Sequence, residues 1–243
     1  MATVLSAQDI RLQFPKAQEP VLDRFSLEVT HGEFVAIVGG SGVGKSTLLR
    51  VLAGLLEPQS GAIRLNAEKR NDRRRRGIVF QDGRLMPWRK LAANVAFGLE
   101  GLSLSKPDRA ARVREVLRLT GLEALADRYP HQMSGGQAQR GGIARALAVE
   151  PDVLLMDEPF SAVDALTREA LQQELLRVWE VSRKAIIFVT HDIMEAVLLA
   201  DRVIVLSGSP AQIALETKIT QARPRHKADE DVAKLVKQIA EAL

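Results

Sequence analysis

The sequence contains no cysteine, and only 4% of its 243 residues are aromatic. The absence of cysteine excludes disulfide frameworks and zinc or iron–sulfur sites with cysteine ligands, and it is compatible with a reducing compartment. Long apolar runs are missing too: stretches such as 153–156 and 185–189 are far shorter than the roughly 20 residues that a membrane-spanning helix needs. If the protein works at a membrane, we expect another subunit to cross it.

Neither sign of charge dominates the chain. Lysine and arginine number 34 against 30 aspartates and glutamates, a formal net charge of +4 that hints at anionic partners such as phosphates without demanding nucleic acid. The first residues show no basic segment followed by an apolar one, so we expect no secretory signal and a cytosolic location. With 46% hydrophobic and 26% charged residues, the composition is that of a folded domain.

Strand and helix patterns alternate along most of the chain. An apolar run at 33–38 predicts a strand, the glycine-rich stretch 39–44 a loop, and apolar residues at helical spacing a helix over 45–56. The later patterns predict strands at 62–65, 77–80, 153–156, 185–189 and 202–206 and helices at 107–119, 121–128, 166–181 and 229–243. We interpret the region 61–80, with its polar run 68–76, as a hairpin or loop. The alternation predicts an α/β fold with a mostly parallel sheet covered on both faces.

The loop after the first of these strands fits the pattern G-x-x-x-x-G-K-[ST]. In such loops glycines turn backbone amides toward phosphate oxygens, and the N-terminus of the next helix adds a positive dipole. The Lys45 ammonium then reaches the terminal phosphates, and the Ser46 hydroxyl binds Mg²⁺. The residues that we expect to hold the nucleotide are Gly39, Gly40, Ser41, Gly42, Val43, Gly44, Lys45, Ser46 and Thr47. A mere glycine-rich turn with an exposed lysine is disfavoured because a strand precedes the loop and a helix follows it.

A pair of carboxylates follows the apolar strand at 153–156. Asp157 stands where the magnesium of a phosphate-loop protein is held. Glu158 would lie beside the terminal phosphate, where a carboxylate can orient and deprotonate the attacking water. The pair therefore predicts hydrolysis in addition to binding. Without the phosphate loop upstream, an exposed acidic pair at the end of a strand would explain these residues equally well.

Residues 133–140 read Met-Ser-Gly-Gly-Gln-Ala-Gln-Arg, which resembles the signature motif of ABC-transporter ATPase subunits. The resemblance implies a phosphate-loop NTPase core with an inserted helical subdomain, and ATP with Mg²⁺ as its ligands. It also implies a head-to-tail homodimer, in which each ATP lies between the phosphate loop of one subunit and the signature of the other. The residues that would contact ATP across this dimer are Ser134, Gly135, Gly136, Gln137 and Asp164.

Further motifs of the family follow in the expected order. Gln81 resembles the glutamine that senses Mg²⁺ and the attacking water, and His191 resembles the switch histidine that contacts the γ-phosphate. By this resemblance the catalytic residues are Lys45, Gln81, Glu158 and His191, and the metal ligands are Ser46, Gln81 and Asp157. Asp164 resembles the aspartate at the dimer contact, and Phe14 the aromatic residue that stacks on adenine. Taken singly, Gln81, Asp164 and His191 would each more often be a surface or satisfied polar residue. For Phe14 the alternative is a core phenylalanine on the first strand.

Two departures from the family's pattern concern the signature. Met133 replaces the commoner leucine, a swap of similar volume. Gly141 and Gly142 stand inside the following helix, where each glycine costs about 1 kcal/mol relative to alanine. We interpret that helix as either soft or closely packed.

The resemblance covers nearly the whole chain, and each motif occurs once. We therefore expect a single ABC ATPase domain over residues 1–243. Its expected parts are a nucleotide-binding core (1–86 and 151–220), a helical signature subdomain (87–150) and a C-terminal tail helix (221–243).

Residues 80–89, Phe-Gln-Asp-Gly-Arg-Leu-Met-Pro-Trp-Arg, resemble the importer group for nitrate, sulfonates and taurine, as do Ser209-Pro210 and Arg223-Pro224-Arg225 near the end. The implied function is the ATP-hydrolysing subunit of a bacterial importer for such a small solute. The implied partners are a second copy of the chain, integral membrane permease subunits at the cytoplasmic face of the inner membrane and, indirectly, a periplasmic or surface solute-binding protein. The alternatives are an ATPase of an exporter or lipid transporter and a soluble regulatory ABC ATPase.

Two features have competing interpretations. The loop of Met86, Pro87 and Trp88 is a candidate surface for a permease segment, whereas Trp88 could instead pack the helical subdomain onto the core. The four arginines at 73–76 could form a nucleic-acid patch. Because no aromatic residues are interleaved with them, we interpret the run as a solvated hairpin loop and expect no nucleic-acid partner.

Overall fold

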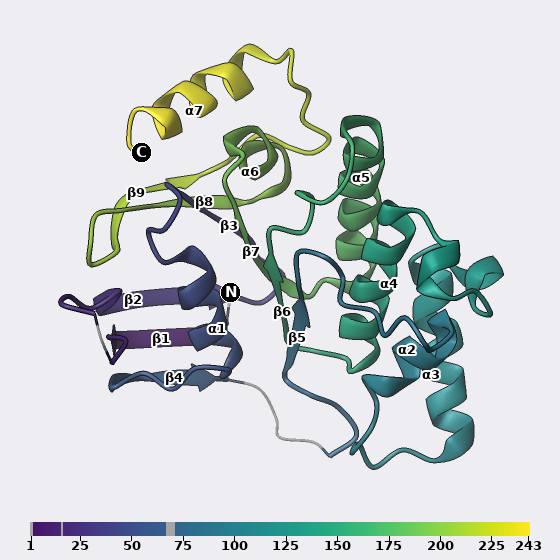
Figure 1. Ribbon diagram of the computed structural model, residues 1–243. Coiled ribbons are helices and arrows are strands. Elements are labelled where there is room, and N and C mark those ends of the chain that lie inside the picture. Colours follow the sequence, from purple (N-terminus) through teal and green to yellow (C-terminus); the bar gives the residue numbers. More distant parts are fainter. Residues whose placement is uncertain (1, 16, 67–70) are drawn as a thin grey trace. The chain divides into compact units, whose positions relative to one another are not determined.

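The computed structural model describes residues 2–15, 17–66 and 71–243 (Figure 1). The chain divides into two compact units, one formed by Met1–Asn66 with Ala185–Leu243 and the other by Ala67–Lys184. Both units combine helices with parallel strand pairs. The α/β class with a mostly parallel sheet, expected from the sequence, is confirmed.

The first unit contains an antiparallel sheet, most of which the apolar patterns do not predict. Its strands, in spatial order, are β2 (Leu22–Thr30), β1 (Thr3–Leu12) and β4 (Ser60–Leu65). Buried and exposed residues alternate along β2, and β4 has no buried residue at all. Such strands mix polar with apolar residues and so lack the continuous apolar run that marks a strand buried on both faces.

The first unit also contributes four strands that are hydrogen-bonded in the order β7 (Ala185–Thr190), β3 (Phe34–Gly39), β8 (Arg202–Ser207) and β9 (Gln212–Lys218). Strand β3 runs parallel to β7 and β8, and β9 runs antiparallel to β8. Helices α1 (Lys45–Ala53) and α6 (Ile193–Leu199) pack against β3 and β7, which are buried at every residue. Because Val38 pairs with Thr190, the loops after β3 and β7 leave the sheet at neighbouring points.

The C-terminal segment is attached to the end of α6. The guanidinium of Arg225 donates to the carbonyl oxygens of Val197 and Ala200, at 2.7 and 2.6 Å. The last helix, α7 (Glu230–Ala240), packs against α6 (Figure 1). The predicted helix 229–243 is too long at its end, since α7 stops at Ala240 and Leu243 is 49% exposed.

The second unit combines one parallel strand pair with helices. The pair consists of β5 (Arg76–Val79) and β6 (Val153–Asp157). The helices are α2 (Leu91–Phe97), α3 (Lys106–Leu119), α4 (Gly135–Ala148) and α5 (Ala165–Ser182), with 3-10 turns at Glu123–Leu125 and Pro130–Gln132. Helix α4 contacts α2, α3, α5 and β5, so the signature helix is the central element of this unit.

Three element predictions need correction. The helix predicted over 45–56 ends at Ala53, because Gly54 adopts the left-handed conformation (φ 73°) that closes a helix. The helix predicted over 121–128 is only the 3-10 turn at Glu123–Leu125. The hairpin interpretation of 61–80 is wrong, since β4 pairs with β1 and β5 pairs with β6.

The arginine run 73–76 is not a solvated hairpin loop either. Residues 68–70 of the polar segment before it lie outside the described residues. Arg73 forms an ion pair of 2.8 Å with Asp152, whose side chain is only 5% exposed. Arg74 donates to the backbone oxygen of Glu100, and Arg76 begins β5. Arg73, Arg75 and Arg76 are therefore partly buried in the second unit, whereas Arg74 is exposed.

Candidate functional site

The phosphate loop connects β3 to α1 in the first unit, as the motif requires. Gly42 and Gly44 have φ values of 81° and 109°, a region that favours glycine. A Cβ on Gly44 would also lie 2.7 Å from a methyl carbon of Val21. On the other side the loop is open, because a Cβ on Gly40 or Gly42 would meet nothing within 4 Å. The loop is thus held by its backbone and has space in front of it for a ligand.

Lys45 lies at the start of α1 and is 6% exposed. Its Nζ donates to the carbonyl oxygens of Gly39 and Gly40 at 2.7 and 2.9 Å, which holds the ammonium within the loop. Helix α1 has no acidic residue in its first turn and no side-chain N-cap, so its own first turn does not neutralise the positive end of the helix. These features suit a phosphate group.

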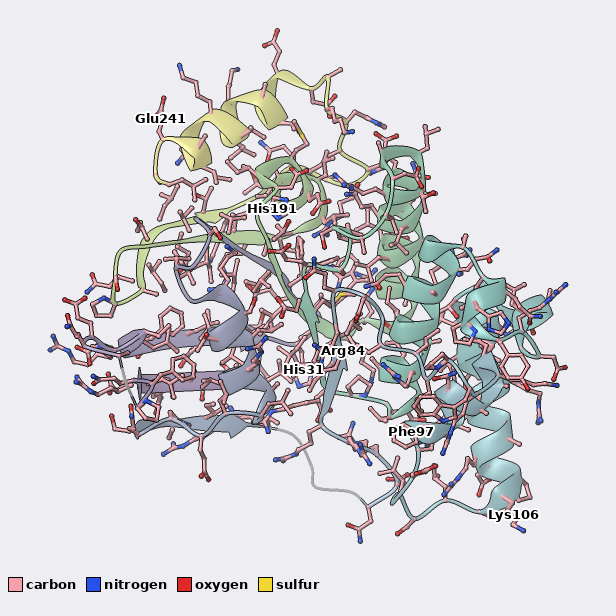
Figure 2. The ribbon with its side chains drawn as sticks, in the orientation of Figure 1. His31, Arg84, Phe97, Lys106, His191 and Glu241 are labelled. Carbon is pink, nitrogen blue, oxygen red and sulfur yellow. The ribbon has the colours of Figure 1, made fainter. Side chains whose placement is uncertain are left out.

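His191 follows β7 and lies in the same unit as the phosphate loop (Figure 2). The His191 side chain is exposed. The residue before it, Thr190, donates its hydroxyl to Glu195 at 2.8 Å and accepts from the backbone N–H of Asp192 at 3.0 Å. Asp192 in turn caps α6 by accepting from the backbone N–H of Glu195. The structure therefore brings the phosphate loop and His191 to one edge of the sheet and fixes the turn that carries the histidine.

Gln81 and the two carboxylates lie together in the second unit. Gln81 is in the loop after β5 and Asp157 ends β6, and these strands are parallel neighbours. Glu158 has a φ of 44°, which is uncommon for a residue other than glycine. Ser161 stabilises this turn by donating its N–H and its hydroxyl to the Glu158 carbonyl oxygen at 3.2 and 2.9 Å. The local fold thus sets the position of the Glu158 backbone.

The signature and Asp164 lie side by side at the starts of α4 and α5. Ser134 caps α4, since its hydroxyl accepts from the N–H of Gln137 and the Gln137 side chain accepts from the N–H of Ser134. Asp164 caps α5 by accepting from Thr167, and this hydrogen bonding lowers the pKa of the Asp164 carboxyl. A Cβ on Gly136 would lie only 2.4 Å from a methyl carbon of Thr167. Any side chain larger than that of glycine at position 136 would therefore clash with Thr167 at the start of α5.

The segment 80–90, which we call the glutamine loop, is fastened to α4 by side chains that the motif analysis does not assign to the site. Gln139 is 3% exposed and donates from Nε2 to the Phe80 carbonyl oxygen at 3.1 Å. The guanidinium of Arg145 donates to the carbonyl oxygens of Gly83 and Arg84 at 2.8 and 2.7 Å. The one sequence signal for Gln139 and Arg145 is that these polar residues stand among the apolar positions of a helix.

The other end of the glutamine loop is fastened to α2 by Asn94, which is fully buried. Its Oδ1 accepts from the N–H of Met86 at 2.7 Å, and its Nδ2 donates to the carbonyl oxygens of Met86, Arg89 and Lys90. Trp88, between these contacts, is 71% exposed. The interpretation of Trp88 as a core packing residue is therefore wrong.

The glycine pair in α4 allows close packing. A Cβ on Gly142 would lie 2.9 Å from the Cα of Gly83 in the glutamine loop, and one on Gly141 would lie 2.8 Å from a methyl carbon of Leu91. Of the two interpretations of this helix, soft or closely packed, the structure supports the second. These glycines let α4 approach the glutamine loop at backbone distance.

We expect Gly142→Ala to destabilise the protein. The new methyl group overlaps backbone atoms of Gly83, which cannot move aside as a flexible side chain could, so we expect an overpacking cost of about 2–3 kcal/mol. This exceeds the roughly 1 kcal/mol gained in helix propensity. Scanning calorimetry should show a melting temperature several degrees below that of the unmodified protein. Gly135→Ala is the matched control in the same helix, because its Cβ would lie an ordinary 3.7 Å from the nearest atom. A Gly142→Ala protein as stable as this control would contradict the argument.

Phe14 lies just after β1 and is 41% exposed. The interpretation as a core residue is therefore wrong. Its predicted contact with adenine stays a prediction, as do the roles of the other site residues. The structure brings the phosphate loop together with His191 in one unit, and Gln81 together with Asp157, Glu158, Ser134 and Asp164 in the other.

A glycine loop between a buried strand and a helix, with an acidic pair after a second buried strand, defines a phosphate-loop nucleotide-binding protein. The sequence profile of the family described as ABC transporter matches residues 22–161 of the chain. The match covers more than half of the chain. The chain therefore belongs to the ABC transporter family and is one of its ATPases.

Known members resemble the chain over most of its length. The taurine import ATP-binding protein TauB of Pseudomonas fluorescens is 47% identical over 211 residues, which cover 86% of this chain and 80% of that protein. The aliphatic sulfonates import ATP-binding protein SsuB 1 of Mesorhizobium japonicum is 46% identical over 215 residues, 88% of this chain and 80% of that protein. A solved dimeric ATP-binding cassette in a post-hydrolysis state, bound to ADP and Pi, shows 32% identity and a TM-score of 0.74 over 90% of this chain and 100% of its own.

Among the described residues, no helix has the length and apolar character needed to cross a membrane.

Proposed function

We propose that the chain is the ATP-hydrolysing subunit of a bacterial importer for a small sulfonate such as taurine or an aliphatic sulfonate. The observation that carries the proposal is the identity of 44–47% to relatives named for taurine and sulfonate import. The pattern at 80–89 supports the same group, which also includes nitrate importers. The name of a relative does not identify the solute that this chain serves, so the solute needs a direct test.

In the proposed site, the residues assigned from the sequence act together on one ATP. Lys45 and the loop amides bind the phosphates, and His191 contacts the γ-phosphate. Glu158 orients the attacking water and takes its proton. Ser46, Gln81 and Asp157 offer hydroxyl, amide and carboxylate oxygens, a hard donor set that fits Mg²⁺. When bound, Mg²⁺ supplies positive charge next to the phosphates.

The proposed working unit is a homodimer. The start of α4 at Ser134 and the start of α5 at Asp164 lie side by side and are accessible, so together they can face a second copy of the chain. In the dimer, Ser134, Gly135, Gly136, Gln137 and Asp164 of one copy complete the ATP site of the other. The dimeric assembly of the related cassette supports this arrangement.

The proposed partners beyond the dimer are membrane permease subunits, with a solute-binding protein on the outer side. This places the chain at the cytoplasmic face of the membrane. The glutamine loop is the proposed contact, because it carries both Gln81 and the exposed Trp88. Because Gln139 and Arg145 attach the loop to α4, a displacement of the loop can be transmitted to the signature at the start of that helix.

The direct test is uptake by cells of the source strain. Deletion of the gene should abolish ATP-dependent uptake of labelled taurine or of an aliphatic sulfonate. The unmodified chain should restore it, and a Glu158→Gln variant should not. Unchanged uptake of taurine, sulfonates and nitrate after deletion would contradict the importer proposal. Retention of a labelled solute that the parent cells expel would favour the exporter alternative.

We expect Trp88→Ala to uncouple transport from hydrolysis. A buried tryptophan at the centre of an interface contributes about 2 kcal/mol or more, so the permease should bind about 30-fold more weakly. The measurement is the ratio of solute uptake to phosphate release in membrane vesicles, which should fall. Val181→Ala, at a 67% exposed position near the end of α5, is the control and should leave the ratio unchanged. An unaltered ratio in Trp88→Ala would refute the proposed contact.

A further inference from the structure

The C-terminal end of helix α6 is held by side chains from the C-terminal tail of the chain (residues 221–243). The last four carbonyl groups of an α-helix have no partner within the helix. Helix α6 has no basic residue in its last turn, and its C-cap residue is Ala200 and not glycine. The donors that meet its last carbonyl groups come from Arg223 and Arg225, which stand 24 to 28 positions later in the sequence.

Arg225 is buried at this helix end, with 8% of its surface exposed. Besides its bonds to the carbonyl oxygens of Val197 and Ala200, it donates from Nε to the carbonyl oxygen of Gln221 at 2.9 Å. Burial, together with the neighbouring Arg223, lowers the pKa of the Arg225 guanidinium to about 10, so the group stays charged at neutral pH. A buried charge is costly unless hydrogen bonds compensate it, and these three bonds hold the guanidinium in one place.

Arg223 binds the same helix end. Its guanidinium donates twice to the carbonyl oxygen of Leu199, at 2.9 and 2.6 Å, and lies 2.8 Å from the carboxylate of Asp201. Asp201 also accepts from the backbone N–H of Phe34, the first residue of β3, at 2.9 Å. The end of α6 is therefore fixed both to the tail and to the strand that leads into the phosphate loop.

The tail segment that supplies these arginines is itself held by α7. Val232 and Ile239 on this helix are buried, and the helix packs against α6 (Figure 1). Apolar burial of this kind attaches the tail to α6 along a second surface. The tail is thus a fixed support for α6.

Helix α6 connects this support to the turn that carries His191 (Figure 2). The helix has only seven residues, a length of roughly 10 Å. At its N-terminal end Glu195 is 5% exposed and accepts the hydroxyl of Thr190, and Asp192 caps the helix. Because His191 lies between Thr190 and Asp192, its backbone follows any displacement of α6.

We propose that Arg225, together with Arg223, is a positioning residue for ATP hydrolysis: by fixing the C-terminal end of α6, it holds His191 where it contacts the γ-phosphate. The inference rests on the role proposed for His191 and adds a role for the tail. Both arginines donate to backbone carbonyl groups of α6 and are not contacts of ATP. Their loss should therefore slow the chemical step without weakening nucleotide binding.

The test is a double-mutant cycle on the full chain, measured as single-turnover ATP hydrolysis. Arg225→Gln keeps an amide donor but loses the charge and the fork of donors, and it should lower the rate about tenfold to hundredfold, as small misplacements of catalytic groups do. His191→Ala should lower the rate about 100-fold or more. Because Arg225 acts through His191, Arg225→Gln should have no further effect in the His191→Ala background. A merely structural role would lower the rate in both backgrounds.

Calorimetric titration with ADP and Mg²⁺ is the second readout. Arg225→Gln should bind ADP as tightly as the unmodified chain, because ADP has no γ-phosphate for His191 to contact. Arg64→Gln is the matched control, since it removes the same charge from an exposed position on β4 in the same unit. It should leave rate and affinity unchanged, and melting curves should show that each variant is folded.

Should Arg225→Gln fail to fold, Arg223→Gln is put through the same cycle, because Arg223 binds the same helix end. Three results would overturn the inference: an unchanged rate, an equal loss of rate in the His191→Ala background, or weakened binding of ADP. A normal rate in His191→Ala alone would refute the role proposed for His191, and this inference with it. Solute uptake enters none of these measurements, so the importer proposal can fail separately.

Discussion

Glu158→Gln is expected to reduce ATP turnover by about 100-fold or more while ATP still binds, because general-base catalysis contributes roughly 10²–10⁴ in rate. Glutamine keeps the length of the side chain and its capacity to hydrogen-bond water, but it cannot accept the proton. The turn that carries residue 158 should persist, since Ser161 binds the backbone oxygen of that residue and not its side chain. Phosphate release in single- and multiple-turnover assays measures the loss.

The same variant should accumulate an ATP-bound dimer, because closure persists when hydrolysis fails. Size-exclusion chromatography with ATP and Mg²⁺ should shift Glu158→Gln, and not the unmodified chain, to the mass of two copies. Glu180→Gln is the control, an equivalent exchange at an exposed position of α5, and should hydrolyse ATP normally. If Glu158→Gln released phosphate as fast as the unmodified chain, another group would have to be the base.

Lys45→Ala should weaken ATP binding by roughly tenfold to hundredfold, the effect of losing one charge-assisted hydrogen bond to a phosphate. Truncation also leaves the carbonyl oxygens of Gly39 and Gly40 without the donor that holds them at 2.7 and 2.9 Å. The loop should therefore become less ordered as well as less positive. Calorimetric titration with ATP gives the affinity directly.

A thermal shift assay provides a second measurement of the Lys45→Ala effect, since a ligand that binds only the folded state raises its melting temperature. ATP should stabilise the unmodified chain clearly more than the variant. Lys106→Ala serves as the control, because Lys106 is exposed at the start of α3 (Figure 2). Equal stabilisation of Lys45→Ala and Lys106→Ala by ATP would contradict the role given to Lys45.

Local chemistry explains which parts of the fold were predictable. The runs at 34–38 and 185–189 are apolar throughout, so they had to be buried strands, and the glycines after the first of them had to form a turn. Strand pairing is not local, and the interpretation of 61–80 as a hairpin failed for that reason. The partners of β4 and β5 are β1 and β6, which lie elsewhere in the sequence.

The candidate site likewise contains residues that the sequence identifies and residues that only the structure identifies. Lys45, Asp157 and Glu158 stand in short motifs whose residue types and spacing carry their own physical reason, and family resemblance supplied the roles of Ser134, Gln81, His191 and Asp164. Gln139 and Arg145 could not be assigned, because a polar residue in a helix does not reveal which distant carbonyl it will meet. Gly142 was ambiguous between weakness and close packing until its neighbour Gly83 was known.

The amino-acid sequence by itself determined the family, the phosphate loop, the acidic pair and the signature, because each depends on neighbours within a few positions. Only the tertiary structure decided how the glutamine loop is held and that the C-terminal tail fixes the end of α6. The contacts from Gln139 to Phe80 and from Arg145 to Arg84 join residues 59 and 61 positions apart. Burial makes such contacts strong and unpaired charges costly, and burial exists only once the distant segments have packed together.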